Sequence, residues 1–160
     1  MMVLPEELLD RIGDHARREY PEECCGVLFG RATNDDHTVE DIAEIENIQQ
    51  ENRKRRFLIS ADQYREAERL AAHRKMELIG FYHSHPDHPA VPSAFDTEHA
   101  LPWFSYVIVA VVRGNVRDAS AWVLADNRTR FEEQLLSVVP SPVHVENGTK
   151  KIMRSPLINE

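Results

Sequence analysis

Apolar positions recur with the period of an α-helix in two stretches of the chain. In the first, from Pro5 to Tyr20, one helical face collects the apolar side chains Leu8, Leu9, Ile12 and Ala16. Pro5 suits the first turn of this helix, and Pro21 marks its end. In the second, Ser60 and Gln63 have the spacing of a capping box, which predicts a helix from Ala61 to about Lys75.

Short apolar runs between these segments predict strands. The ranges concerned are Cys25–Gly30, Phe57–Ile59, Glu77–Ser84, Tyr106–Val112 and Val116–Leu124. Thr38–Ile48 predicts one or two strands, and Phe131–Val139 a last strand or a short helix. The prolines from Pro86 to Pro92 predict a stiff loop, followed by a short helix over Asp96–Leu101.

This order of elements favours one α/β domain in which helices cover a mixed β-sheet. A chain of 160 residues suits a single domain with one sizeable core. We expect the domain to occupy residues 1–139. Residues 140–160 are rich in proline, polar and charged residues, so we expect a loosely held C-terminal tail.

Composition removes several classes of function. The net charge of −8 disfavours nucleic acid as a partner, and the basic cluster Arg53–Arg56 is interpreted as a solvated loop or strand edge. No apolar run reaches the roughly 18 residues that a membrane helix needs. Met1–Glu7 has no signal-peptide pattern, so we expect a cytoplasmic protein. The adjacent Cys24 and Cys25 predict small buried side chains and no disulfide framework.

The strongest chemical signal is the pair His83 and His85 at the end of a predicted strand. Side chains two residues apart leave a strand on the same face, so both imidazoles can bind one metal ion. Asp96 returns after the proline-rich loop and can supply a third, anionic ligand. Three protein ligands leave one position of a tetrahedral zinc ion for water, whose pKa then falls to about 7.

From these residues alone, two interpretations stay open. Histidines near a turn often only form hydrogen bonds, and Ser93 with Asp96 also fits a helix N-cap followed by an acidic first turn. Neither the HExxH pattern nor the zinc-deaminase pattern is present, and no lysine follows Gly30 as a phosphate-binding loop requires.

The spacing of these residues resembles the JAMM motif of the MPN+ metalloprotease family. His83-x-His85 is followed after seven residues by Ser93, and after two more by Asp96. The family also has an upstream Glu-x-x-Gly, which Glu23-Cys24-Cys25-Gly26 matches, with Gly30 after a further apolar run. The resemblance covers most of the chain, from about Leu8 to Leu124.

The resemblance implies a single MPN-like domain, layered as in cytidine deaminases, with one zinc ion per chain. His83, His85 and Asp96 would hold the zinc. Glu23 would act as general acid and base, taking a proton from the zinc-bound water and giving it to the leaving amine. Ser93 would donate a hydrogen bond to the oxyanion. Glu22 is the competing carboxylate, but its spacing to Gly26 is one residue too long.

The resemblance also suggests a class of substrate. Eukaryotic members are isopeptidases of ubiquitin, and short prokaryotic relatives process the C-terminal tails of ubiquitin-like sulfur-carrier proteins. The hypothesis is therefore a cytoplasmic zinc metallopeptidase acting on such a tail. The alternatives are a zinc hydrolase of small peptides or amino-acid conjugates, and a non-catalytic MPN scaffold.

Other residues near the motif have simpler interpretations. We interpret His88 and His99 as solvated or hydrogen-bonded imidazoles, although either would be placed to suggest a second metal. Trp103, Phe104 and Tyr106 either line a groove for an extended tail or pack in the core, and the sequence favours the core.

Overall fold

The computed structural model describes residues 1–141, 143–146 and 149–152 of the chain. Within these residues the helices are α1 (Glu6–Glu19), α2 (Ala61–His73) and α3 (Ala94–His99). The strands are β1 (Met2–Pro5), β2 (Cys25–Thr33), β3 (Asp36–Ile45), β4 (Glu77–Pro86), β5 (Ser105–Val112), β6 (Asn115–Leu124), β7 (Phe131–Gln134), β8 (Leu136–Val139), β9 (Val143–Glu146) and β10 (Thr149–Ile152).

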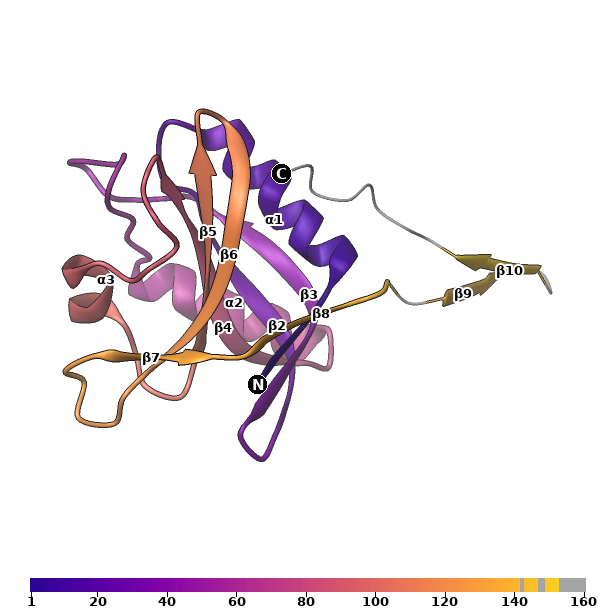
Figure 1. The fold of residues 1–160 in the computed structure, drawn as a ribbon. Helices are drawn as coiled ribbons and strands as arrows, with labels where there is room; N and C mark the ends of the chain where they lie inside the picture. The colour runs from indigo at the N-terminus through magenta and orange to yellow at the C-terminus, as the bar shows by residue number, and fades with distance from the viewer. Residues whose placement is uncertain (142, 147–148, 153–160) are drawn as a thin grey trace.

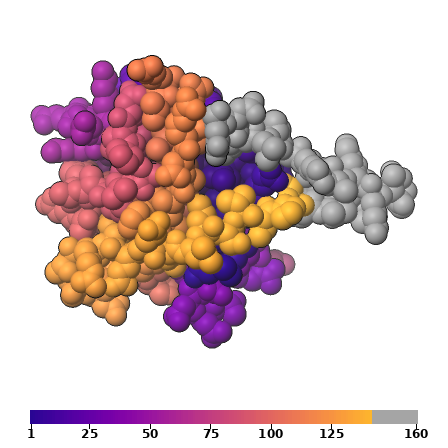
Figure 2. Space-filling model, in the orientation of Figure 1, coloured from indigo at the N-terminus to yellow at the C-terminus, as the bar shows by residue number. Residues whose placement is uncertain are grey.

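One mixed sheet of eight strands, in the order β7-β6-β5-β4-β2-β3-β1-β8, organises the molecule (Figure 1). The β4–β5 pair is parallel, whereas β2 is antiparallel to both of its neighbours. The strands β7 and β8 lie at opposite ends of this order, where β7 pairs with β6 and β8 pairs with β1. Only Leu135 separates β7 from β8 in the sequence, so one short segment joins the two edges of the sheet. The sheet therefore curls round, and Figure 2 shows this closing segment as a yellow band across the visible face.

The alternation of side chains along the strands separates two apolar layers. In β4, Ile79 and Tyr82 pack in the layer that contains α1, whereas Leu78 and Phe81 pack in the layer that contains α2. These pairs are three residues apart because the register of β4 against β2 shifts between Leu78 and Gly80, which interrupts the alternation once. Figure 1 shows the two helices on opposite sides of the sheet. The even spacing from Phe81 places His83 and His85 on the α2 side. The predicted single α/β domain with a mixed sheet covered by helices is confirmed.

Local sequence signals account for the helix boundaries. Ser60 Oγ accepts the Gln63 N–H and the Gln63 side chain accepts the Ser60 N–H, so the predicted capping box is present. The helix α1 has acidic residues in its first turn and basic residues in its last, which suits the helix dipole. Within the described residues, no helix is long and apolar enough to cross a membrane.

Several predicted elements were wrong or incomplete. Phe57–Ile59 forms no strand, because its backbone hydrogen bonds are local contacts with the loop around Asn47 rather than a ladder. Phe131–Val139 forms two strands rather than one element, and β1 was not predicted at all. The short helix begins at Ala94, two residues before the predicted start. Pro86 is the last residue of β4 and not part of the following loop.

The C-terminal region can be described only in part. The strands β9 and β10 pair as an antiparallel hairpin that is separate from the main sheet. The remaining residues of the predicted tail beyond Ser141, namely 142, 147–148 and 153–160, lie outside the described residues. The division into residues 1–139 and a loosely held tail stays a prediction.

Candidate metal centre

The register between β2 and β4 brings Glu23 to the two histidines. Cys25 pairs with His83, and the two strands are antiparallel, so Glu23, two residues before Cys25, comes opposite His85, two residues after His83. The backbone of Cys24 exchanges hydrogen bonds with Ser84, whose Oγ accepts the Cys24 N–H at 2.8 Å and whose N–H bonds the Cys24 carbonyl. The Ser84 side chain thus points away from the histidines and binds the backbone that precedes β2.

The third candidate ligand, Asp96, is held by the start of α3. Ser93 Oγ accepts the Asp96 N–H at 3.1 Å, and Asp96 Oδ2 accepts the Ser93 N–H at 2.9 Å, which makes a second capping box. The helix-cap interpretation of this pair is therefore correct as local structure. The same geometry fixes the Asp96 carboxylate beside the end of β4.

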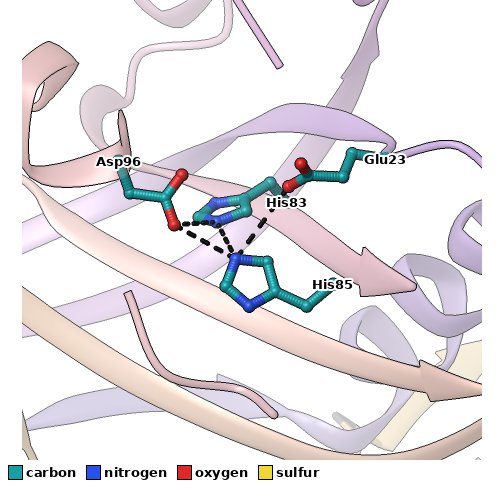
Figure 3. A group of neighbouring side chains, drawn as sticks. All are labelled: Glu23, His83, His85 and Asp96. Atoms are coloured by element: carbon teal, nitrogen blue, oxygen red, sulfur yellow. Dashed lines mark hydrogen bonds and ion pairs between the residues drawn. The ribbon is translucent and has the colours of Figure 1, made fainter. Parts of the chain in front are cut away.

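Four side chains converge where these elements meet (Figure 3). One ligand atom from each of Glu23, His83, His85 and Asp96 lies within 4.8 Å of all the others, and all four residues are buried. His83 Nε2 is 3.1 Å from His85 Nε2 and 3.2 Å from Asp96 Oδ2, and His85 Nε2 is 3.1 Å from the same oxygen. Glu23 Oε1 lies 3.9 Å from His85 Nε2.

A hydrogen bond of His85 indicates which of its two ring nitrogens can bind a metal. Its Nδ1 lies 2.7 Å from the Pro89 carbonyl oxygen, which can only accept, so Nδ1 carries a hydrogen and Nε2 is the nitrogen through which the imidazole can bind a metal. That nitrogen faces another imidazole nitrogen and a carboxylate oxygen. Three donor atoms this close together repel each other unless a cation, either a proton or a metal ion, lies between them.

The spacing of the three atoms fits a small tetrahedral cation. Ligand atoms at about 2.0–2.2 Å from a tetrahedral zinc ion lie roughly 3.3 Å apart, close to the separations of 3.1–3.2 Å. Among the described residues, Asp96 Oδ1 and both carboxyl oxygens of Glu23 are buried without a hydrogen-bond partner. Two imidazoles and one carboxylate therefore fit a metal of the zinc type.

The electrostatics of the two carboxyl groups differ sharply. Burial first, and then the negative charge of Asp96, raise the pKa of Glu23 to about 9. Burial acts in the same direction on Asp96, but its interactions with the imidazoles of His83 and His85 and with the Ser93 N–H outweigh it, and its pKa lies well below its usual range. Asp96 is therefore suited to stay anionic, and Glu23 to hold a proton.

The other candidate residues lie around this cluster. Ser93 is placed at the start of α3, and its hydroxyl keeps its own hydrogen available to donate. His88 stacks on His85, with ring centroids 4.1 Å apart, and His99 bonds the Phe95 carbonyl, so neither joins the metal-ligand group found in the described residues. Cys24 and Cys25 are buried and unpaired, as predicted.

Two contacts of the site had no sequence signal that we recognised. Phe57 stacks on the His83 ring at 4.4 Å, although its run was assigned to a strand. Asn47 donates from Nδ2 to the Glu23 carbonyl and to the Arg56 carbonyl, while its Oδ1 accepts from two backbone N–H groups. A single asparagine in a polar loop forms no sequence pattern, so this hydrogen bond to the Glu23 backbone could not be predicted.

Two hollows reach the cluster from different sides. The first, of about 370 Å³, is named the apolar hollow; His83 and Asp96 line it together with mostly apolar side chains such as Phe57, Phe81, Phe95 and Tyr106. The second, of about 390 Å³, is named the acidic hollow; Glu23 lines it together with Glu19, Glu22, Glu44, Glu46 and Arg53. Tyr106 is buried, whereas Trp103 is half exposed and packs on His37 outside both hollows.

Known proteins resemble the chain in sequence and in fold. Residues 5–125 match the family model described as prokaryotic homologs of the JAB domain. A desampylase of Haloferax volcanii is 32% identical over 125 residues, which cover 76% of this chain and 87% of the relative.

Two solved structures extend the comparison. The solution structure of a Desulfitobacterium hafniense protein superposes with a TM-score of 0.77 at 26% identity, covering 88% of this chain and 94% of the other. A JAB1/MPN domain protein of Archaeoglobus fulgidus gives a TM-score of 0.56 at 18% identity, covering 87% and 99%, which shows a shared fold. Together with the family match, these similarities show that the chain belongs to the JAB/MPN family, among its prokaryotic homologs.

Proposed function

We propose that the protein is a zinc-dependent metallopeptidase that hydrolyses an amide bond at the C-terminal tail of a ubiquitin-like or sulfur-carrier protein. The observation that supports this most is the meeting of candidate ligand atoms of His83, His85 and Asp96 at one buried point, with the unpaired carboxyl of Glu23 beside it. Relatedness to a desampylase supports a ubiquitin-like protein as the class of substrate.

In this proposal His83, His85 and Asp96 hold one zinc ion. Bound zinc supplies a Lewis acid that polarises a carbonyl oxygen and lowers the pKa of water to near neutrality. The chain's own contribution begins with orientation, because the Pro89 carbonyl fixes the tautomer of His85 and the Ser93 N–H fixes the Asp96 carboxylate.

Glu23 is proposed to move the proton. Its carboxyl lies within 4 Å of His85 Nε2 and meets no hydrogen-bond donor among the described residues, so it is free to take a proton from a nucleophilic water and pass it to the leaving amine. In the metal-free site the raised pKa keeps this carboxyl protonated at pH 7, so the proposed uptake step belongs to the zinc-bound enzyme, in which the positive charge of the ion favours the carboxylate. Asn47 and the Arg53 carbonyl hold the Glu23 backbone, which keeps the carboxyl beside the ligands.

Ser93 is proposed to stabilise the oxyanion that forms at the scissile carbonyl. Its Oγ already accepts the Asp96 N–H, which orients the hydroxyl while leaving its hydrogen free to donate. The apolar hollow adjoins His83 and Asp96 and is proposed to take the tail on the carbonyl side of the scissile bond.

Mass spectrometry of an extended substrate tests the proposal. A sulfur-carrier protein with extra C-terminal residues is incubated with the enzyme, with and without a chelator, and we expect one cleavage that the chelator abolishes. Glu23→Gln should lose cleavage and keep zinc, whereas Glu133→Gln, at an exposed position that lines neither hollow, should retain both. His83→Ala should lose zinc, as measured by metal analysis.

Three results would count against the proposal. Cleavage that persists in the chelated enzyme would exclude a metal-dependent reaction. Full activity of Glu23→Gln would exclude Glu23 as the general acid and base. Cleavage of small amides alone, with the protein substrate intact, would favour a hydrolase of peptides or amino-acid conjugates.

A further inference from the structure

The acidic hollow lies on the side of Glu23 that the apolar hollow does not reach. Glu23 lines the acidic hollow and is absent from the lining of the apolar one, whereas His83 and Asp96 line only the apolar one. The two hollows therefore reach the same group of four side chains from different directions. One ends at the candidate metal ligands and the other at the candidate proton donor.

The acidic hollow has an excess of negative charge. Besides Glu23, its lining has the carboxylates of Glu19, Glu22, Glu44 and Glu46. Arginine side chains pair with two of these four carboxylates. Arg53 Nη1 lies 3.7 Å from Glu22 Oε2, and Arg18 pairs with Glu44. Among the described residues no ion pair neutralises Glu19 or Glu46, and both are exposed.

The remaining groups around the hollow do not reverse this charge. His15 is buried beside Tyr82, and burial lowers its pKa to about 4, so it is neutral at pH 7. Helix α1 ends at Glu19, and the partial negative charge of its C-terminal end adds to that of the carboxylates.

A second observation points to a ligand in this hollow. The Glu23 side chain is 2% exposed, and neither of its oxygens has a hydrogen-bond partner among the described residues. A buried carboxyl without a partner is costly unless a ligand group meets it. In the proposed reaction that group is the nitrogen of the leaving amine.

We propose that the acidic hollow is the subsite for the leaving amine, and that it selects acceptor segments with lysine or arginine beside the modified amine. This inference rests on the proposed function, because it assumes that an amide bond is cut between the two hollows. The carbonyl side of the bond must face the metal ligands, and its nitrogen must face Glu23. The residues flanking that nitrogen then lie against Glu19, Glu22 and Glu46, whose charges attract cations.

Matched isopeptide substrates test this subsite. Each has the same ubiquitin-like tail joined to the lysine ε-amine of a short acceptor peptide, flanked by arginines in one substrate and by glutamates in the other. A third substrate carries a neutral aminocoumarin as leaving group. We expect the wild-type enzyme to cleave the arginine substrate with roughly tenfold higher kcat/KM than the glutamate substrate, mostly through KM, and the ratio to fall at high salt.

Variants locate the preference in the hollow. Glu19→Gln with Glu46→Gln should reduce the ratio to about two or three, while Glu66→Gln with Glu133→Gln, two exposed residues outside the hollow, should leave it unchanged. The ratio is measured within one preparation, so partial misfolding of a variant does not imitate the effect.

The outcomes separate this inference from the function itself. Equal kcat/KM for the arginine and glutamate substrates in an active wild-type enzyme would overturn the subsite and leave the peptidase intact. An unchanged ratio in the Glu19 and Glu46 double variant would also overturn it. Failure to cleave all three substrates would instead refute the proposed function.

Discussion

Replacement of Glu23 by glutamine should stabilise the metal-free protein. The fold raises the pKa of this carboxyl from 4.5 to about 9, chiefly through burial. Between these two values the unfolded chain releases the proton and the folded chain keeps it, so the folded state loses stability as the pH rises. The contribution of Glu23 is therefore most favourable below pH 4.5 and is lost progressively up to about pH 9.

The size of the effect follows from this shift. Each pH unit between the two pKa values changes the free energy of unfolding by about 1.4 kcal/mol, which gives a penalty of about 3 kcal/mol at pH 7. Glutamine has nearly the same volume and does not titrate. Glu23→Gln should thus unfold with about 3 kcal/mol more free energy than the wild type at pH 7, equivalent to a rise in Tm of roughly 6–12 °C.

Urea unfolding followed by circular dichroism measures this difference. Both proteins are treated with chelator and compared at pH 5, 7 and 8.5, where the stabilisation should grow with pH. Glu22→Gln is the matched control, because Glu22 is half exposed and pairs with Arg53. It should change the free energy by less than about 0.5 kcal/mol. Equal stability of wild type and Glu23→Gln at pH 8.5 would refute the idea that burial sets the protonation of Glu23.

Three further perturbations test other parts of the structure. Gly26→Ala should cost about 3 kcal/mol in urea unfolding, because its Cβ would lie 2.2 Å from two ring carbons of the fully buried Tyr82; a loss below about 1 kcal/mol would contradict this packing. Ser84→Ala should cost about 1–3 kcal/mol by leaving the buried Cys24 N–H without its acceptor, and an unchanged urea midpoint would show that another group replaces it. Zinc at a hundredfold excess over its Kd should stabilise the chelated protein by about 2.7 kcal/mol in a thermal melt, whereas an equal shift with magnesium would argue against imidazole ligands.

Short-range patterns determined much of this protein. The helical faces, the capping box of Ser60 and the placement of His83 and His85 on one side of a strand depend on residues no more than a few positions apart. Their periodicity is fixed by backbone geometry, so they could be predicted directly. The sequence also nominated Glu23, Ser93 and Asp96, but only through the spacing of a family motif.

Non-local pairing decided the rest. The strands β1 and β8 form because residues at the two ends of the domain pair with each other, and nothing within either short segment indicates a partner more than 130 residues away. Phe57–Ile59 has an apolar composition suited to a strand, yet its backbone pairs with no strand of the sheet. Strand formation requires a neighbour, which the pattern of one segment does not specify.

The candidate site shows the same division. The sequence placed two histidines on one face, whereas the β2–β4 register determines that Glu23 lies opposite His85, and the start of α3 determines how near Asp96 comes. The two hollows exist only in the folded chain, because their walls come from α1, α2, α3, β3, β4, β5 and the loops between distant elements. Local geometry thus supplied the type of ligand, and tertiary packing supplied the distances that let four side chains meet at one buried point.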